Sequence, residues 1–73
     1  MRKSIFTKNY EFLVKQLLKA RRQSKLRQAD VAKRLKRTQS YISKIEAGQL
    51  RLDVIQLKEL AALYKKELDF FIK

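Results

Sequence analysis

Residues 28–48 read QADVAKRLKRTQSYISKIEAG and contain two short segments with apolar residues at helical spacing. These apolar residues are Val31, Ala32 and Leu35 in the first segment and Ile42 and Ile45 in the second. A turn of only three residues, 36–38, separates the two segments. Because helices joined by so short a turn cannot lie antiparallel, the stretch predicts two helices that cross steeply, as in a helix-turn-helix unit.

The second segment is harder to assign, because Thr, Ser, Tyr and Ile have low helix propensity and also suit a strand. Three features favour a helix. Thr38 is a good N-cap, Ile42 and Ile45 are three residues apart, and Gly48 supplies a C-terminal stop. We therefore expect tertiary packing to hold this helix in place.

The region before this unit predicts a basic arm, residues 1–6, followed by an amphipathic helix capped by Thr7 or Asn9. The helix should end near residue 22 or 23. Its apolar stripe follows the spacing of one helix face and comprises Tyr10, Leu13, Val14, Leu17 and Leu18.

The region after the unit predicts two more helices. Asp53 and Gln56 form a capping box for a helix that runs to about residue 65, and a final short helix is expected over roughly 68–72. With one Gly, no Pro and apolar residues at helical spacing throughout, the sequence predicts a single all-α domain of five helices over residues 1–73.

Charge is distributed unevenly along the chain. The 19 Lys and Arg residues outnumber the 7 Asp and Glu residues and give a formal net charge of +12. Residues 1–51 carry all of this excess, whereas residues 52–73 carry equal numbers of basic and acidic residues. Such clustering predicts a surface that faces a polyanion, with nucleic acid favoured over an acidic membrane or an acidic protein.

The composition argues against several other classes of protein. The chain has neither Cys nor His, so we expect no disulfide framework, no metal site and no cofactor. Its carboxylates are scattered and it has no glycine-rich phosphate loop, so we do not expect an enzyme. No apolar run approaches the roughly 18 residues of a membrane span, and the N-terminus lacks a signal-peptide pattern. We expect a cytoplasmic protein that does not act on membranes.

The two crossing segments resemble the Cro/repressor-type helix-turn-helix domains, called the XRE family. The resemblance covers residues 10–71 and is most specific at 28–32, at Leu35 and at 39–48, with a family-like continuation at 51–54. It implies a compact lambda-repressor-like fold with the helix-turn-helix at about residues 28–47. It also implies binding of the second helix in the major groove of double-stranded DNA.

In this family the first turn of the second helix points into the groove. This implies base contacts for the side chains on that side, namely Gln39, Ser40, Ser43 and Lys44. A glutamine amide offers a donor and an acceptor that match adenine N6 and N7, and serine can contact several bases. The lysine can donate to guanine O6 and N7, or to a phosphate.

The resemblance also implies side chains that contact phosphates and fix the register on the duplex. In similar proteins a glutamine at the position of Gln28 bonds a phosphate, and often the glutamine that opens the second helix, here Gln39. The other phosphate candidates flank the groove-facing surface and are Arg27, Lys36, Arg37, Thr38, Tyr41 and Arg51.

Two further implications concern stability. The family commonly ties its first helix to the end of the second helix of the unit with a salt bridge, which implies a pair between Arg21 and Glu46. The chain has Lys25 and Lys36 where the family often has Gly, and Arg27 where it often has a Thr or Ser cap. We expect each replacement to cost about 1 kcal/mol and to add a positive charge near the phosphates.

The leading hypothesis is a sequence-specific transcriptional regulator, a repressor that binds a palindromic operator as a homodimer. The dimer surface is expected at an apolar patch of Phe70, Phe71 and Ile72, although these residues can equally complete a small core. Two alternatives stay open. The chain can be the DNA-binding antitoxin of a toxin–antitoxin pair, with that patch as its protein-partner site. From another class, it can bind nucleic acid without sequence preference or act on membranes as a cationic amphipathic peptide.

Overall fold

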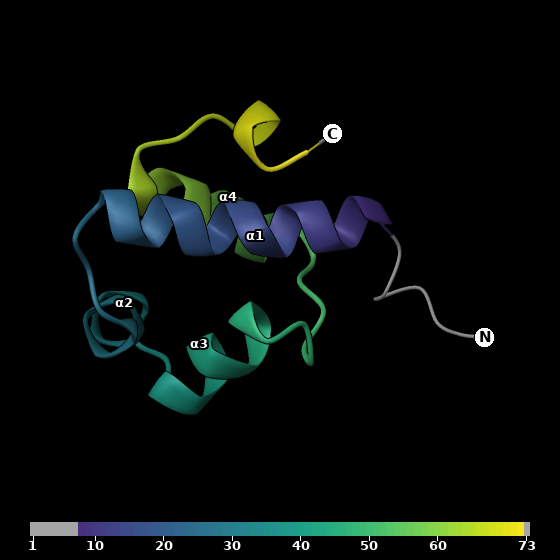
Figure 1. The fold of residues 1–73 in the computed structure, drawn as a ribbon. Helices are drawn as coiled ribbons and strands as arrows, with labels where there is room; N and C mark the ends of the chain where they lie inside the picture. The colour runs from purple at the N-terminus through teal and green to yellow at the C-terminus, as the bar shows by residue number, and fades with distance from the viewer. Residues whose placement is uncertain (1–7, 73) are drawn as a thin grey trace.

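The computed structural model describes residues 8–72, which form four α-helices and one short 3₁₀ helix and contain no strand. In chain order the elements are α1 (Lys8–Gln23), α2 (Gln28–Leu35), α3 (Gln39–Glu46), α4 (Val54–Tyr64) and η2 (Leu68–Phe70). Helix α1 packs against α3 on one side and α4 on another, α2 packs against α3, and η2 packs against α4 (Figure 1). The expected arm, residues 1–6, and the expected cap Thr7 lie outside the described residues.

The all-α class is as predicted, but the expected fifth helix is a single turn of 3₁₀ helix, η2. The chain leaves α4 at Lys65, and Phe71 must already lie in the core six residues later. A 3₁₀ helix rises about 2.0 Å per residue against 1.5 Å for an α-helix, so it spans a short connection with fewer residues. The distance back to the core therefore favours 3₁₀ geometry here.

The hydrophobic core is formed by side chains of α1, α2, α3 and α4, and the C-terminal segment closes it. The largest fully buried side chains are Phe71, Leu17, Ile42, Ile45 and Val31. Burying one such side chain stabilises a fold by about 1.5–3 kcal/mol, so these few residues account for much of the stability of a small domain. None of the described helices is both long and apolar enough to span a membrane.

The face that α1 buries differs from the predicted stripe. Tyr10 and Leu17 are buried as expected, but Ala20 is buried where Val14 and Leu18 were expected, and those two side chains stay half-exposed. Residues 10, 17 and 20 share one face of a helix as well as the predicted set does. The small side chain of Ala20, fully buried, allows the neighbouring elements to approach α1 closely.

The four α-helices all end in the same hydrogen-bonded arrangement, the Schellman motif. In α2, for example, the N–H groups of Lys36 and Arg37 donate to the carbonyl oxygens of Lys33 and Ala32, at 3.2 and 2.8 Å. The motif requires one residue with a left-handed backbone, and these residues are Lys25, Lys36, Gly48 and Lys65, with φ values of 59°, 58°, 76° and 58°. The chain's one glycine therefore ends α3, whereas lysines end the other three helices.

The start of α4 follows the predicted capping box. The carboxylate of Asp53 accepts a hydrogen bond from the backbone N–H of Gln56 at 2.8 Å, and the Gln56 side chain accepts one from the Asp53 N–H at 2.9 Å. Leu52 is half-buried and Leu57 is buried, and the two stand at the positions of a hydrophobic staple around this cap. This cap fixes where the segment after α3 enters α4.

Candidate nucleic-acid interface

Helix α2 packs against α3, and the side chain of Ala32 in α2 is almost completely buried. The turn between them contains only Lys36, Arg37 and Thr38. The hydroxyl oxygen of Thr38 accepts a hydrogen bond from the backbone N–H of Tyr41 at 3.1 Å, so Thr38 is the N-cap of α3 as predicted. The hydroxyl proton of Thr38 stays available as a donor to an acceptor outside the protein.

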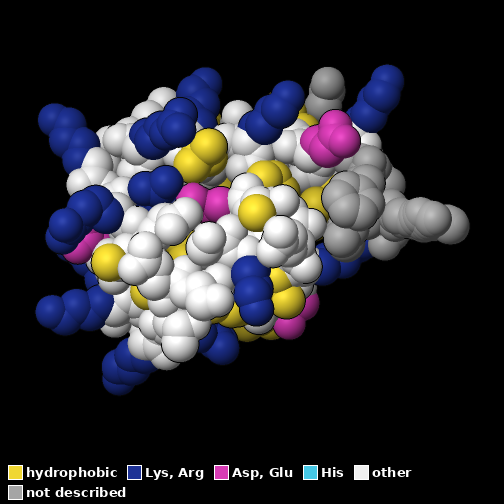
Figure 2. All heavy atoms as spheres, turned by 60° about the horizontal axis from the view of Figure 1, so that its bottom comes forward, with side chains coloured by type: hydrophobic (Ala, Val, Ile, Leu, Met, Phe, Trp, Pro, Cys, Tyr) yellow, Lys and Arg dark blue, Asp and Glu magenta, His cyan; other side chains and the backbone are white. Residues whose placement is uncertain are grey.

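Helix α3 has one buried and one exposed side. Ile42 and Ile45 are each 1% exposed and face the core. The opposite side exposes the four side chains expected to contact bases, Gln39, Ser40, Ser43 and Lys44. Figure 2 brings this side forward and shows a broad area that is neither charged nor hydrophobic, with Lys and Arg side chains mainly along its upper and left edges. Uncharged polar groups bordered by cations suit a surface that reads base edges and holds phosphates.

The carboxylate of Glu46, at the end of α3, joins three helices. One oxygen accepts a hydrogen bond from Arg21 Nε of α1 at 2.7 Å, which is the predicted ion pair, and the other accepts one from Gln28 Nε2 of α2 at 2.9 Å. The Glu46 side chain is only 7% exposed. Arg21 also donates through Nη1 to the carbonyl oxygen of Leu26, at 3.0 Å. Both Glu46 oxygens thus have internal partners, so Glu46 holds the end of α3 in place.

The structure corrects the expectation for Gln28. Its amide nitrogen bonds Glu46, and no hydrogen bond joins Gln28 to Gln39 within the described residues. No sequence pattern signals this partner, because Gln28 and Glu46 meet only through the packing of α2 against α3. The Gln28 amide keeps a second N–H group for a phosphate, but its orientation is already set by the carboxylate.

Arg27 precedes α2 without capping it, because an arginine side chain has no acceptor atom. Instead the carboxylate of Asp30 accepts from the Arg27 backbone N–H at 2.9 Å and from the guanidinium at 3.3 and 3.4 Å. The hydrogen bond from the Arg27 side chain lowers the pKa of Asp30. Arg27, expected to contact a phosphate, is therefore paired with Asp30, and its remaining guanidinium N–H groups stay available to a phosphate.

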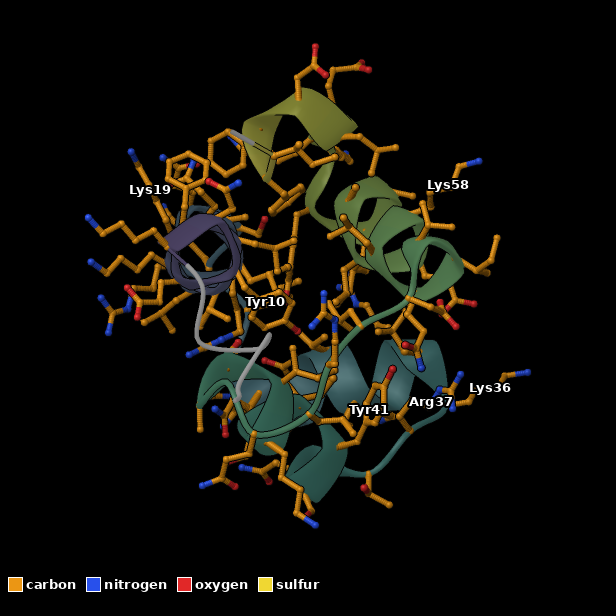
Figure 3. The ribbon with its side chains drawn as sticks, turned by 90° about the vertical axis from the view of Figure 1, so that its right-hand side faces the viewer. Tyr10, Lys19, Lys36, Arg37, Tyr41 and Lys58 are labelled. Atoms are coloured by element: carbon orange, nitrogen blue, oxygen red, sulfur yellow. The ribbon has the colours of Figure 1, made fainter. Side chains whose placement is uncertain are left out.

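Lys36, Arg37 and Tyr41 lie together at one end of the interface, as Figure 3 shows. The Arg37 guanidinium lies 5.0 Å from the centre of the Tyr41 ring, a cation–π contact. Partial burial raises the pKa of Tyr41, and the neighbouring Arg37 opposes that rise. The phenol therefore remains a neutral donor at physiological pH.

Arg51, the last predicted phosphate contact, is exposed between α3 and α4. Its guanidinium lies 5.4 Å from the centre of the Tyr10 ring. The candidate phosphate contacts thus occur on both sides of the exposed face of α3, in the turn before it and in the segment after it.

The C-terminal apolar patch is only partly as expected. Phe71 is completely buried in the core and cannot serve as a dimer surface. Phe70 is half-buried, packs edge-to-face on Phe71 and carries the Lys66 ammonium over its ring at 4.7 Å. Ile72 is 54% exposed. Adjacent apolar residues point to different sides of a short turn, which a linear pattern of three such residues does not reveal.

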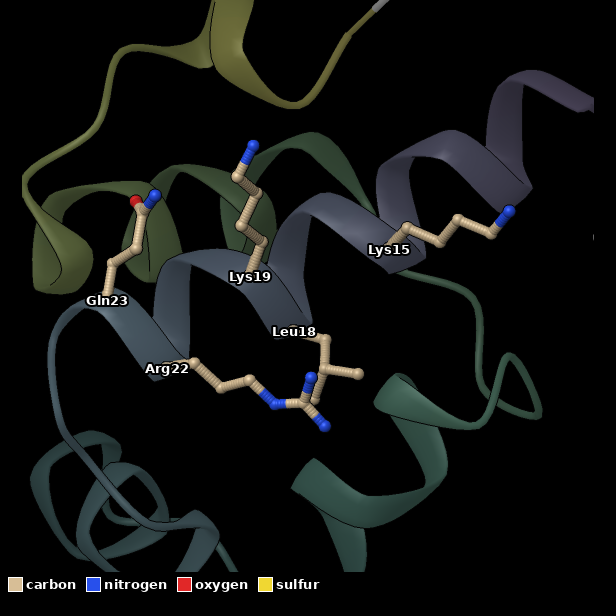
Figure 4. A pocket seen from close by; sticks show the side chains of 5 residues that line it. All are labelled: Lys15, Leu18, Lys19, Arg22 and Gln23. Atoms are coloured by element: carbon tan, nitrogen blue, oxygen red, sulfur yellow. The ribbon is translucent and has the colours of Figure 1, made fainter.

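A basic surface on α1 was not predicted. Lys15, Lys19 and Arg22 project from the outer face of this helix and line an open hollow with Leu18 and Gln23 (Figure 4). The spacing of four and three residues places these cations on one helix face and could have identified the surface. They contribute to the positive field around the α2–α3 unit without being part of it.

Comparison with known proteins agrees with this geometry. The family model described as "Helix-turn-helix" matches residues 17–71, which include the C-terminal part of α1 and all of α2, α3, α4 and η2. A comparison with curated proteins gave no match, and neither did one with solved structures. The fold, the exposed polar face of α3 and the family match together make the protein a DNA-binding transcriptional regulator. The chain belongs to the Cro/repressor-type helix-turn-helix family, also called the XRE family.

Proposed function

We propose that the protein is a cytoplasmic, sequence-specific repressor that binds a palindromic operator as a homodimer. The observation that carries this proposal is the exposed face of α3. Its four polar side chains stand over two buried isoleucines, so they are presented rigidly, and cations border them. A rigid polar helix face can discriminate base edges, whereas a uniformly basic face binds phosphates of any sequence.

Within this proposal Gln39, Ser40, Ser43 and Lys44 contact base edges. The phosphate contacts come from Gln28, Lys36, Arg37, Thr38, Tyr41 and Arg51, and from the guanidinium N–H groups of Arg27 that Asp30 leaves available. Arg21 and Glu46 take no part in binding, because each satisfies the other inside the fold.

The test is selection of bound sites from duplexes of random sequence. The proposal expects an enriched palindrome whose half-sites lie about one helical turn, 10–10.5 base pairs, apart. Substituting Gln39→Ala should relax the preference at one position of each half-site and cost about 1–3 kcal/mol in discrimination there. Enrichment of no sequence, together with a steep salt dependence, would instead identify a binder without sequence preference.

We place the dimer contact at Ile72 and the exposed part of Phe70. They lie in the part of the chain with balanced charge, where two strongly basic copies repel each other least. The variant Ile72→Asp should weaken binding to the palindrome and leave binding to an isolated half-site unchanged. Equal binding of both duplexes by this variant and the parent protein would locate the contact elsewhere.

A second candidate function is that of a DNA-binding antitoxin. One observation favours it, namely that Val54 and Ile55, at the start of α4, are 59% and 61% exposed. Neighbouring exposed apolar side chains suit a protein partner. Co-purification of a tightly bound small protein that is lost in the variant Ile55→Asp would support this function over an independent repressor.

A further inference from the structure

The hydroxyl group of Tyr10 bridges the two residues on either side of Arg51. It accepts a hydrogen bond from the backbone N–H of Leu52 at 3.1 Å and donates one to the carbonyl oxygen of Leu50 at 3.3 Å. Tyr10 belongs to the first turn of α1 and is 8% exposed. Figure 3 shows it pointing from α1 toward the part of the molecule that contains α3 and the segment after it. A side chain from α1 thus holds the backbone of a distant loop.

The same side chain also contacts the side chain of that loop residue. The Arg51 guanidinium lies over the Tyr10 ring, 5.4 Å from its centre. An aromatic ring attracts a cation through its electron-rich face and supplies no countercharge. This contact therefore restricts the orientation of the guanidinium.

Backbone hydrogen bonds and a helix cap fix the segment around Arg51 at both of its ends. On one side Gln49 donates its N–H to the Lys44 carbonyl oxygen at 2.8 Å, which closes α3. On the other side Asp53 begins α4 with its capping box. Only residues 50–52 lie between these fixed points, and the Tyr10 hydroxyl holds the two outer ones. The direction in which Arg51 leaves the backbone is thus set by this hydroxyl.

We propose that Tyr10 is a positioning residue for DNA binding, which acts by holding Arg51 in the orientation that contacts a backbone phosphate beside α3. This inference rests on the proposed function, because it assigns Arg51 a phosphate. It adds that a residue of α1, outside the helix-turn-helix, sets the strength of that contact. Tyr10 itself touches no DNA in this arrangement.

A double-mutant cycle on a mixed-sequence duplex tests this mechanism. Arg51→Gln should lower the slope of log affinity against log salt by about 0.9, the value for one lost phosphate contact. Tyr10→Phe keeps the ring and removes only the hydroxyl, so it should lower the salt slope by part of the amount expected for Arg51→Gln. When Arg51 is already Gln, adding Tyr10→Phe should change the affinity by less than about twofold, because the two changes affect the same contact.

Several outcomes would overturn the inference. One is a Tyr10→Phe effect of equal size with and without Arg51, since that would mean the hydroxyl acts on the fold as a whole. Another is an unchanged salt slope in Arg51→Gln. Tyr64→Phe is the matched control, because it removes a phenol oxygen from the core at the other end of α4 and should leave the slope unchanged. If the parent protein binds no duplex at all, the proposed function fails and not merely this inference.

A second measurement does not depend on whether Tyr10→Phe folds. In the parent protein the amide N–H of Leu52 should exchange slowly with solvent, and the Nε–H resonance of Arg51 should shift when the duplex is added. Fast exchange at Leu52 or an unchanged Arg51 resonance would contradict the positioning role.

Discussion

Glu46 shows how a single side chain can define the geometry of a binding surface without being part of it. Its carboxylate receives hydrogen bonds from α1 and α2 while it belongs to α3, so the three helices meet at one charged group. An ion pair with so little exposure has lost most of its hydration, and its attraction offsets that loss only when both partners are present. Removing one partner therefore lowers the free energy of unfolding by more than the intact pair contributes to it.

We predict that Glu46→Ala lowers the free energy of unfolding by about 3–5 kcal/mol, because it leaves the Arg21 guanidinium buried and unpaired. A domain of this length has a total stability of about 4–11 kcal/mol. The variant should therefore be largely unfolded, or close to unfolding, at room temperature. Urea denaturation measures the change. The control Glu59→Ala removes an exposed carboxylate from α4 and should leave the midpoint nearly unchanged. Equal midpoints for both variants would contradict the role given to Glu46.

Tyr64 supplies a second prediction, on the dependence of stability on pH. Burial raises the pKa of its phenol from the ordinary value of 10 to about 12, and the nearby Glu46 carboxylate adds to the rise. The folded state therefore holds this proton more tightly than the unfolded chain. The associated stability is complete below pH 10 and is lost as the pH rises through about 12.

The comparison of parent protein and Tyr64→Phe isolates this effect from the titration of exposed lysines, which both proteins share. The difference in unfolding free energy between them should be constant below pH 10 and should move in favour of Tyr64→Phe between pH 10 and 12. A constant difference over that whole range would show that the phenol is not buried as described.

Residue identities alone predicted some of these contacts and not others. The pairing of Arg21 with Glu46 followed from the family resemblance and from the scarcity of acids in a basic region. The bond between Gln28 and Glu46 did not, since it depends on the angle at which α2 crosses α3. The role of Tyr10 could not be predicted either, because it depends on how close the end of α3 lies to the start of α1.

At the scale of elements, the helix ends distinguish this chain. A left-handed residue other than glycine costs about 1–2 kcal/mol, and three of the four Schellman motifs carry a lysine at that position. The sequence indicated two of these positions, Lys25 and Lys36, from missing glycines. The sequence did not indicate Lys65, because no glycine was expected at the end of α4.

Two of these lysines, Lys36 and Lys65, allow effects on stability and on DNA affinity to be separated. Lys36→Gly and Lys65→Gly should each raise the free energy of unfolding by about 0.5–1 kcal/mol, the relieved strain less the greater entropy of the unfolded chain. Lys36 adjoins the turn before α3, so its replacement should also weaken DNA binding. Lys65 ends α4, so its replacement should not. Melting curves and titrations of a duplex measure both effects, and tighter DNA binding by Lys36→Gly would contradict the phosphate contact.

Prediction of elements from the sequence was reliable where local signals act and poor where packing decides. Thr38, Gly48 and the Asp53–Gln56 box marked helix ends that the structure contains. Which face of α1 is buried, and whether residues 68–72 form a helix, depend on distances between elements that no local pattern encodes. The predicted apolar stripe on α1 therefore included Leu18, whereas the buried face of the helix contains Ala20.

At the scale of the whole molecule, the positive charge extends well beyond the residues that face the proposed DNA. The outer face of α1 adds Lys15, Lys19 and Arg22 to the cations of α2, α3 and their connections. Cations that make no contact still attract DNA over the Debye length, which is about 30 Å at 0.01 M salt and 8 Å at 0.15 M. These side chains should therefore affect how fast the protein associates with DNA.

We predict that the double variant Lys15→Gln/Lys19→Gln slows association with duplex DNA severalfold at about 0.01 M salt and only slightly at about 0.15 M. Its dissociation rate should equal that of the parent protein. The control Lys58→Gln/Lys65→Gln removes the same charge from the neutral C-terminal part and should slow association less. Stopped-flow measurements decide between these outcomes, and faster dissociation of the α1 variant would mean that this face touches DNA directly.

The burial of Phe71 also constrains the order in which the protein can fold during synthesis. The ribosome releases α1 through α4 before it releases the side chain that completes their core, and Gln16 must wait for a hydrogen-bond partner 54 residues later. Until then the core cluster that contains Leu17, Ile42 and Ile45 lacks Phe71, its largest fully buried side chain. The domain therefore completes its folding only when the segment that contains Phe71 has been synthesised. Before that, chaperones and proteases can recognise the incompletely folded chain.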